Sequence, residues 1–83
     1  AKAANQLLDI AGIKASFVMT DYNGKLHVSA RSIDEVNVQI IMEKIGGGGH
    51  LNIAAVQLEN TTYEEAKSLL KETIDKMLME GEI

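Results

Sequence analysis

The sequence predicts an α+β fold in which helices cover a small mixed β-sheet. Three observations support this prediction. An Asn-Gly pair at 23–24 separates two stretches suited to strands, and two later segments repeat apolar residues with helical spacing. Four consecutive glycines at 46–49 interrupt the chain between them. The expected order is helix, strand, strand, helix, glycine loop, strand and helix, in a single domain over residues 1–83.

The first helix is expected over residues 2–11, because the apolar residues of this segment share one helical stripe and Gly12 follows at a position typical of a helix end. The stripe consists of Ala4, Leu7, Leu8 and Ala11.

A β-hairpin is expected next, with strands over 15–20 and 25–31 joined by a type I′ turn at Asn23-Gly24. The second strand alternates apolar and polar residues. One face of it is therefore polar and carries His27, Ser29 and Arg31.

The central helix shows capping-box spacing at Ser32 and Glu35, followed by an amphipathic stripe that stops at the glycines. The stripe consists of Val38, Ile41, Met42 and Ile45. After the glycines, Ala54-Ala55 is compatible with a helical turn, and residues 56–59 read as a strand.

The last helix is expected over about 62–79. Thr61 and Thr62 each have a glutamate three residues later, as in a capping box. The acidic and basic residues of this helix alternate at helical spacing, which is typical of a solvated face.

Composition excludes several classes of protein. Without cysteine the chain has neither a disulfide framework nor a thiolate zinc site. No apolar run approaches the length of a membrane span and the first residues do not resemble a signal peptide, so we expect a cytoplasmic domain. Eight basic against twelve acidic residues give a net charge of −4, which argues against long nucleic acids as partners.

The glycine loop, Gly46, Gly47, Gly48 and Gly49, has two interpretations. It is either a flexible surface turn or a close approach of backbone N–H groups to an anion, with a helix N-terminus just after His50. His50 would then donate a hydrogen bond to a phosphate or carry a proton, or else merely cap the loop.

Arg31 is the only arginine of the chain. Its guanidinium offers a bidentate fork to phosphate, beside the hydroxyls of Ser29 and Ser32. The alternative is a surface salt bridge to Asp34 or Glu35. We interpret His27 as a structural or solvent-exposed residue. No metal site and no catalytic residue is predicted, because the two histidines lack acidic neighbours and no nucleophile has a visible base.

Two further functional classes fit part of the pattern. The glycines match the Gly-x-x-Gly loop of a KH-like nucleic-acid-binding module, although the basic residue usual between those glycines is missing. A regulatory or interaction domain with a mobile glycine turn is the other class.

Four motifs together resemble the C-terminal DHH-associated domain of the DHH phosphoesterase superfamily. They are Ser-Ala-Arg-Ser at 29–32, Asn-Val at 37–38, Gly-Gly-Gly-Gly-His at 46–50 and Ala-Ala at 54–55. Within the superfamily, the sequence is most similar to the cyclic-di-AMP phosphodiesterases of the GdpP (YybT) type. Relatives such as the RecJ nucleases have glycine after the paired alanines, where this chain has Val56.

The resemblance implies the substrate-binding lobe of a manganese-dependent phosphodiesterase that hydrolyses cyclic-di-AMP to the linear dinucleotide. Two manganese ions would lie in a DHH lobe of the same parent chain, so the isolated domain is expected to be inactive and to hold no cofactor. The resemblance places Arg31 and Ser32 on the nucleotide phosphate and the glycine loop with His50 on the terminal nucleotide.

Other members of the superfamily keep alternatives open. The parent could be a RecJ-like nuclease, an oligoribonuclease-type enzyme or one labelled an exopolyphosphatase. The resemblance also leaves open a homodimer and a parent anchored in the cell membrane.

Overall fold

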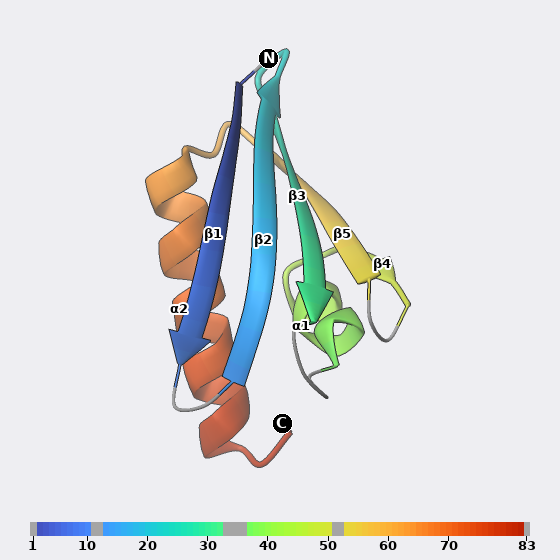
Figure 1. Ribbon diagram of the computed structural model, residues 1–83, viewed down its shortest axis with the longest axis vertical. Helices are drawn as coiled ribbons and strands as arrows, with labels where there is room; N and C mark the ends of the chain where they lie inside the picture. Colours follow the sequence, from blue (N-terminus) through green and yellow to red (C-terminus); the bar gives the residue numbers. More distant parts are fainter. Residues whose placement is uncertain (1, 11–12, 33–36, 51–52, 83) are drawn as a thin grey trace.

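One five-stranded antiparallel sheet and two helices make up the fold (Figure 1). The structure is a computed structural model and describes residues 2–10, 13–32, 37–50 and 53–82. The strands follow the order β1-β2-β3-β5-β4. The α+β class is confirmed. The elements are β1 (Lys2–Ile10), β2 (Ile13–Tyr22), β3 (Lys25–Ser32), α1 (Val38–Lys44), β4 (Gly48–Gly49), β5 (Ile53–Glu59) and α2 (Tyr63–Met79).

The predicted mixed sheet is wrong, because every strand pair between described residues is antiparallel. The reason lies in the length of α1. Its seven residues span about 10 Å, whereas the eight residues of β3 span about 26 Å. Because α1 cannot carry the chain back along β3, β5 starts near the end of β3 and runs in the opposite direction.

The helix predicted over 2–11 is also wrong, since residues 2–10 form β1. This edge strand pairs with β2 without interruption, from Lys2 opposite Asp21 to Ile10 opposite Ile13. The segment is rich in alanine and leucine, whose helix preference amounts to only a few tenths of a kcal/mol per residue. Pairing with the free edge of a ten-residue strand satisfies its backbone groups and outweighs that preference.

The hairpin prediction is confirmed. Asn23 and Gly24 have φ values of 52° and 74°, and positive φ at both central residues is the requirement of a type I′ turn. The turn fixes the β2–β3 register, which places Val18 opposite Ser29 and Ser16 opposite Arg31.

Two local predictions around α1 need correction. The helix is capped by Asn37, whose side-chain oxygen accepts a hydrogen bond from the Ile40 N–H at 3.3 Å, and not by Ser32. Glu35, the other half of the predicted capping box, lies outside the described residues. Ala54 and Ala55 do not form a helical turn, because both lie inside β5, where they pair with β3 and β4.

The helix α2 confirms the last prediction. Thr62 caps it in a reciprocal capping box with Glu65, in which both hydrogen bonds measure 3.1 Å. None of the described helices combines the length and the apolar composition that crossing a bilayer requires.

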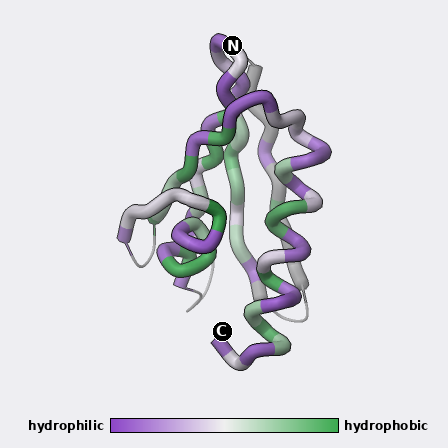
Figure 2. Tube along the Cα trace, turned by 180° about the vertical axis from the view of Figure 1, so that it is seen from behind, coloured by the Kyte–Doolittle hydropathy of each residue, from purple (hydrophilic) through white to green (hydrophobic). Residues whose placement is uncertain are grey.

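Both helices lie on the same side of the sheet (Figures 1 and 2). The core between them and the sheet contains the inward-facing residues of three strands, such as Phe17 on β2, Val28 on β3 and Val56 on β5. The helices contribute Ile41 and Met42 of α1, and Ala66, Leu70, Ile74 and Met77 of α2.

No described segment covers the opposite side of the sheet. We call this side the open face; it carries Ser16, Val18, Ser29, Arg31, Ile53 and Ala55. Its apolar side chains are correspondingly accessible, with Ile53 at 53% and Val18 at 37% exposure. A sheet with one buried and one solvated face is ordinary for antiparallel strands, and it leaves the open face available to a ligand.

Candidate functional site

Arg31 stands on the open face near the end of β3. Its register partners are Ser16 on β2 and Ile53 on β5. Its side chain is exposed, and it makes no ion pair with any residue that the structure describes. The alternative partners predicted from sequence, Asp34 and Glu35, lie outside the described residues. The exposed side chain of Arg31 is therefore accessible to a ligand above the sheet.

A hollow of about 350 Å³ surrounds Arg31 on the open face. It is lined by Ser16, Val18, Ser29, Ala30, Arg31 and Ile53. The lining combines one cation, two hydroxyls and short apolar side chains. This combination suits a ligand with both an anionic and an apolar part.

The structure separates the two serines that the sequence placed beside Arg31. Ser29 is exposed on the open face, two residues from Arg31. Ser32 is opposite the buried Ala15, so alternation places it on the helix side of the sheet. Sequence reasoning missed Ser16, although the register of a two-residue turn at Asn23-Gly24 already requires Ser16 to pair with Arg31.

The glycine loop begins as the C-cap of α1. The Gly47 N–H donates to the Met42 carbonyl at 2.8 Å and the Gly46 N–H donates to the Glu43 carbonyl at 3.2 Å. This pair of bonds is a Schellman motif, and Gly46 takes the left-handed conformation that it requires, with φ of 97°. The first two glycines of the loop are therefore hydrogen-bonded to the helix.

Gly47 lies against β5. A Cβ atom at Gly47 would be 2.2 Å from the Ala55 carbonyl oxygen and 2.7 Å from the Val56 Cβ. The site therefore permits only glycine without a shift of the backbone.

Gly48 is different, because a Cβ there would meet nothing within 4 Å. Gly48 pairs with Ala55, which in turn pairs with Ser29. The fold of this chain does not require glycine at 48. The lack of a side chain instead extends the shallow surface beside the Arg31 hollow.

His50 is exposed and belongs to the same end of the sheet. Its backbone N–H donates to the Ile53 carbonyl at 2.7 Å, and Ile53 is the register partner of Arg31. With neighbouring strands about 5 Å apart, His50 and Arg31 lie on either side of Ile53 at a backbone separation of about 10 Å. The loop and the arginine predicted from sequence are thus neighbours in the fold.

The predicted helix N-terminus after His50 is wrong, because residues 53–59 form a strand. The loop therefore joins a helix to a strand pair. A KH module requires its Gly-x-x-Gly loop between two helices, so the structure does not support that alternative.

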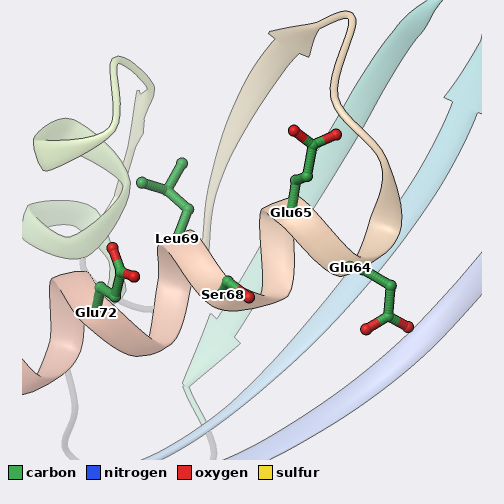
Figure 3. A pocket seen from close by; sticks show the side chains of 5 residues that line it. All are labelled: Glu64, Glu65, Ser68, Leu69 and Glu72. Atoms are coloured by element: carbon green, nitrogen blue, oxygen red, sulfur yellow. The ribbon is translucent and has the colours of Figure 1, made fainter.

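A second hollow, of about 410 Å³, lies on α2 and is lined by Glu64, Glu65, Ser68, Leu69 and Glu72 (Figure 3). Glu65 and Leu69 point to one side of the helix and Glu64 points away from them. Three carboxylates repel an anionic ligand, so this hollow suits a phosphate less well than the hollow around Arg31.

The ion pair between Lys44 Nζ and Glu82 Oε1, at 3.0 Å, lies away from the open face. The hydrogen bond from Lys44 and the attraction of Glu82 raise the pKa of Lys44 above its ordinary value. Within the described ranges, no three side chains of the metal-ligating types come together. Neither observation adds a charged group to the site around Arg31.

Comparison with known proteins gives consistent results. Residues 1–80 match the family described as the DHHA1 domain. The cyclic-di-AMP phosphodiesterase PdeA of Listeria monocytogenes serotype 1/2a (strain 10403S) is 51% identical over 76 residues, which are 90% of this chain and 12% of that protein.

Two proteins named cyclic-di-AMP phosphodiesterase GdpP are similarly related. The protein of Geobacillus thermodenitrificans (strain NG80-2) is 49% identical over 75 residues, 89% of this chain and 11% of its own length. That of Bacillus subtilis (strain 168) is 45% identical over 82 residues, 98% of this chain and 12% of its own length. The resemblance predicted from sequence is confirmed, and the chain spans about one eighth of these relatives.

Proposed function

Because this chain belongs to the DHHA1 domain family, we propose that it is the nucleotide-binding lobe of a phosphodiesterase that hydrolyses cyclic-di-AMP to the linear dinucleotide. The observation that carries the proposal is the Arg31 hollow on the open face, which is lined by Ser29, Arg31 and Ile53, and Ile53 is hydrogen-bonded through its carbonyl to the backbone of His50. Three relatives that share most of this chain are named for that substrate.

The proposed roles follow from position. Arg31 holds a phosphate through its bidentate fork, and the hydroxyls of Ser16 and Ser29 donate to the same oxygens. His50 binds the phosphate from the far side of Ile53. Gly48 allows the sugar or base to lie close to the backbone, while the other three glycines hold the loop in place.

This lobe contributes charge stabilisation and orientation. A guanidinium hydrogen-bonded to the phosphodiester lowers the free energy of the negative charge that the phosphodiester gains during hydrolysis. The two manganese ions are proposed to lie in the DHH lobe of the parent chain, where such metals supply an activated water. The isolated lobe is expected to be inactive.

A short ligand is favoured over a long one. Binding that follows a strand of nucleic acid requires a continuous basic groove. This chain has a net charge of −4 and a single arginine. We therefore propose a cyclic or linear dinucleotide as ligand and the DHH lobe as partner, in a cytoplasmic part of a membrane-anchored parent.

The proposal is tested by NMR titration of the ¹⁵N-labelled chain with linear di-adenylate, with cyclic-di-AMP and with a mixed-sequence RNA oligomer. We expect saturable shifts at residues 16–18, 29–31, 46–50 and 53 with the dinucleotides alone. Shifts with RNA alone, or dinucleotide shifts confined to α2, would refute the proposal.

Substitution of Arg31 tests the site directly. Arg31→Ala is expected to weaken dinucleotide binding by about 1.5 to 3 kcal/mol, the usual contribution of hydrogen bonds to a charged group. The matched control is Lys25→Ala, which removes one positive charge from the same strand and face, six residues away. Equal losses in the two variants would mean that net charge, and not a phosphate site at Arg31, governs binding.

A further inference from the structure

We infer that Gln57, together with its register partner His27, reads the base of the bound dinucleotide and selects adenine. The inference rests on the proposed function and adds the residues that set its base preference. His27 lies opposite Thr20 on β2 and opposite Gln57 on β5, so these polar residues form one row across the sheet.

This row lies on the open face together with Arg31. His27 precedes Arg31 by four residues on β3, and Gln57 follows Ile53 by four residues on β5. At about 3.4 Å per residue, the row is about 14 Å from the row of Arg31. An extended nucleotide whose phosphate contacts the long Arg31 side chain, and which follows β3 toward its first residue, places its base near His27 and Gln57.

The surface between these two rows is smooth. The intermediate row consists of Val18, Ser29, Ala55 and Gly48, which are register neighbours in that order. Ser29 and Ala55 are exposed, and the space above Gly48 is empty. A planar base can therefore lie flat over the intermediate row while its polar edge reaches the next one.

The side chains of His27 and Gln57 are accessible to a ligand. His27 and Gln57 are exposed, and in the part of the chain that the structure describes neither side chain takes part in a hydrogen bond. A carboxamide has adjacent donor and acceptor atoms. Glutamine is thus able to donate to N7 of adenine and to accept from the N6 amino group at the same time.

Guanine is a poorer match to the same carboxamide. On the edge that carries N7, guanine presents two acceptors, N7 and O6, where adenine presents one acceptor and the N6 donor, so the two-bond pairing of the carboxamide with adenine is not possible with guanine there. A carboxylate, which only accepts, would instead suit the N–H groups on the Watson–Crick edge of guanine. We therefore expect Gln57→Glu to shift the base preference from adenine toward guanine and not merely to weaken binding.

The test is isothermal titration of the 83-residue chain with linear di-adenylate and with linear di-guanylate. The wild-type chain is expected to prefer di-adenylate. Gln57→Ala should lower the ratio of the two affinities roughly ten-fold, and Gln57→Glu should lower it further, toward guanine. Gln39→Ala is the matched control, because Gln39 is a glutamine on α1, on the other side of the sheet. This variant should keep the wild-type ratio of the two affinities.

The outcomes separate this inference from the proposed function. If Arg31→Ala weakens binding of both dinucleotides while both Gln57 variants keep the wild-type ratio, base reading by Gln57 is overturned and the phosphate site stands. A wild-type chain without preference between the two dinucleotides would also overturn the inference. If Arg31→Ala changes neither affinity, the proposed function itself fails.

Discussion

Replacing Gly47 by alanine tests how tightly the glycine loop is built into the fold. The new Cβ would lie 2.2 Å from the Ala55 carbonyl oxygen and 2.9 Å from the Val56 Cα. Ordinary contact requires about 3.5 Å, so loop and strand must move apart by about 1 Å. The loop cannot simply retreat, because the Gly47 N–H is hydrogen-bonded to the Met42 carbonyl.

Moving the loop away from β5 costs free energy because backbone hydrogen bonds are lost. Separation of the loop from β5 disrupts the pairing of Gly48 with Ala55, at about 1 kcal/mol for each backbone hydrogen bond, and strains the packing of Val56. We expect a loss of about 2 kcal/mol in the free energy of unfolding. For a domain of this size, the Tm falls by about 8 to 16 °C.

The assay is thermal unfolding followed by circular dichroism, with Gly48→Ala as the matched control. At Gly48 the Cβ meets no atom and φ is not positive, so the same substitution should leave the Tm unchanged or raise it slightly. Equal Tm values for the two variants would refute the structural account of the loop. Because its Cβ extends over the open face, Gly48→Ala should weaken dinucleotide binding instead.

The remaining predictions concern α2, the end of the chain and His50. Thr62→Ala removes the capping box and should cost about 1 kcal/mol, whereas Thr62→Ser should retain it, as thermal unfolding of both variants will show. Glu82 raises the pKa of Lys44 above 10.5, so their ion pair stabilises the fold fully below pH 10.5 and is lost as the pH rises through the raised pKa. The Tm difference between wild type and Glu82→Gln should therefore vanish in strong alkali. A Tm difference that grows in strong alkali would contradict the ion pair. His50→Ala should weaken dinucleotide binding by about 1.5 kcal/mol without changing the Tm, and an unchanged affinity would remove His50 from the site.

Much of the fold could be predicted from local signals. The Asn23-Gly24 turn, the capping box at Thr62 and the apolar stripe of α1 each depend on residues close in sequence, and each is confirmed. The helix predicted over 2–11 is wrong because the composition favours a helix, whereas the partner of this segment is the strand edge that β2 supplies. A local pattern contains no information about that partner.

The same distinction applies to the site. Alternation along β3 correctly places Ser29 and Arg31 on one polar face, and the hairpin register adds Ser16. The contribution of Ile53 and Gln57 could not be predicted, because it depends on how β5 returns to β3 after a helix and a loop. That return is decided by the length of α1 and by its glycine cap.

The distance in sequence between β3 and β5 has an energetic consequence. Two residues connect β2 to β3, whereas twenty residues, 33–52, connect β3 to β5. Because the entropic cost of closing a loop grows with the logarithm of its length, closing the longer connection costs about 2 kcal/mol more free energy. A dinucleotide that contacts Arg31 and Gln57 at once would bridge β3 and β5, the pair of strands whose connection has the larger closure entropy. Ligand binding and the last step of chain closure would then stabilise each other.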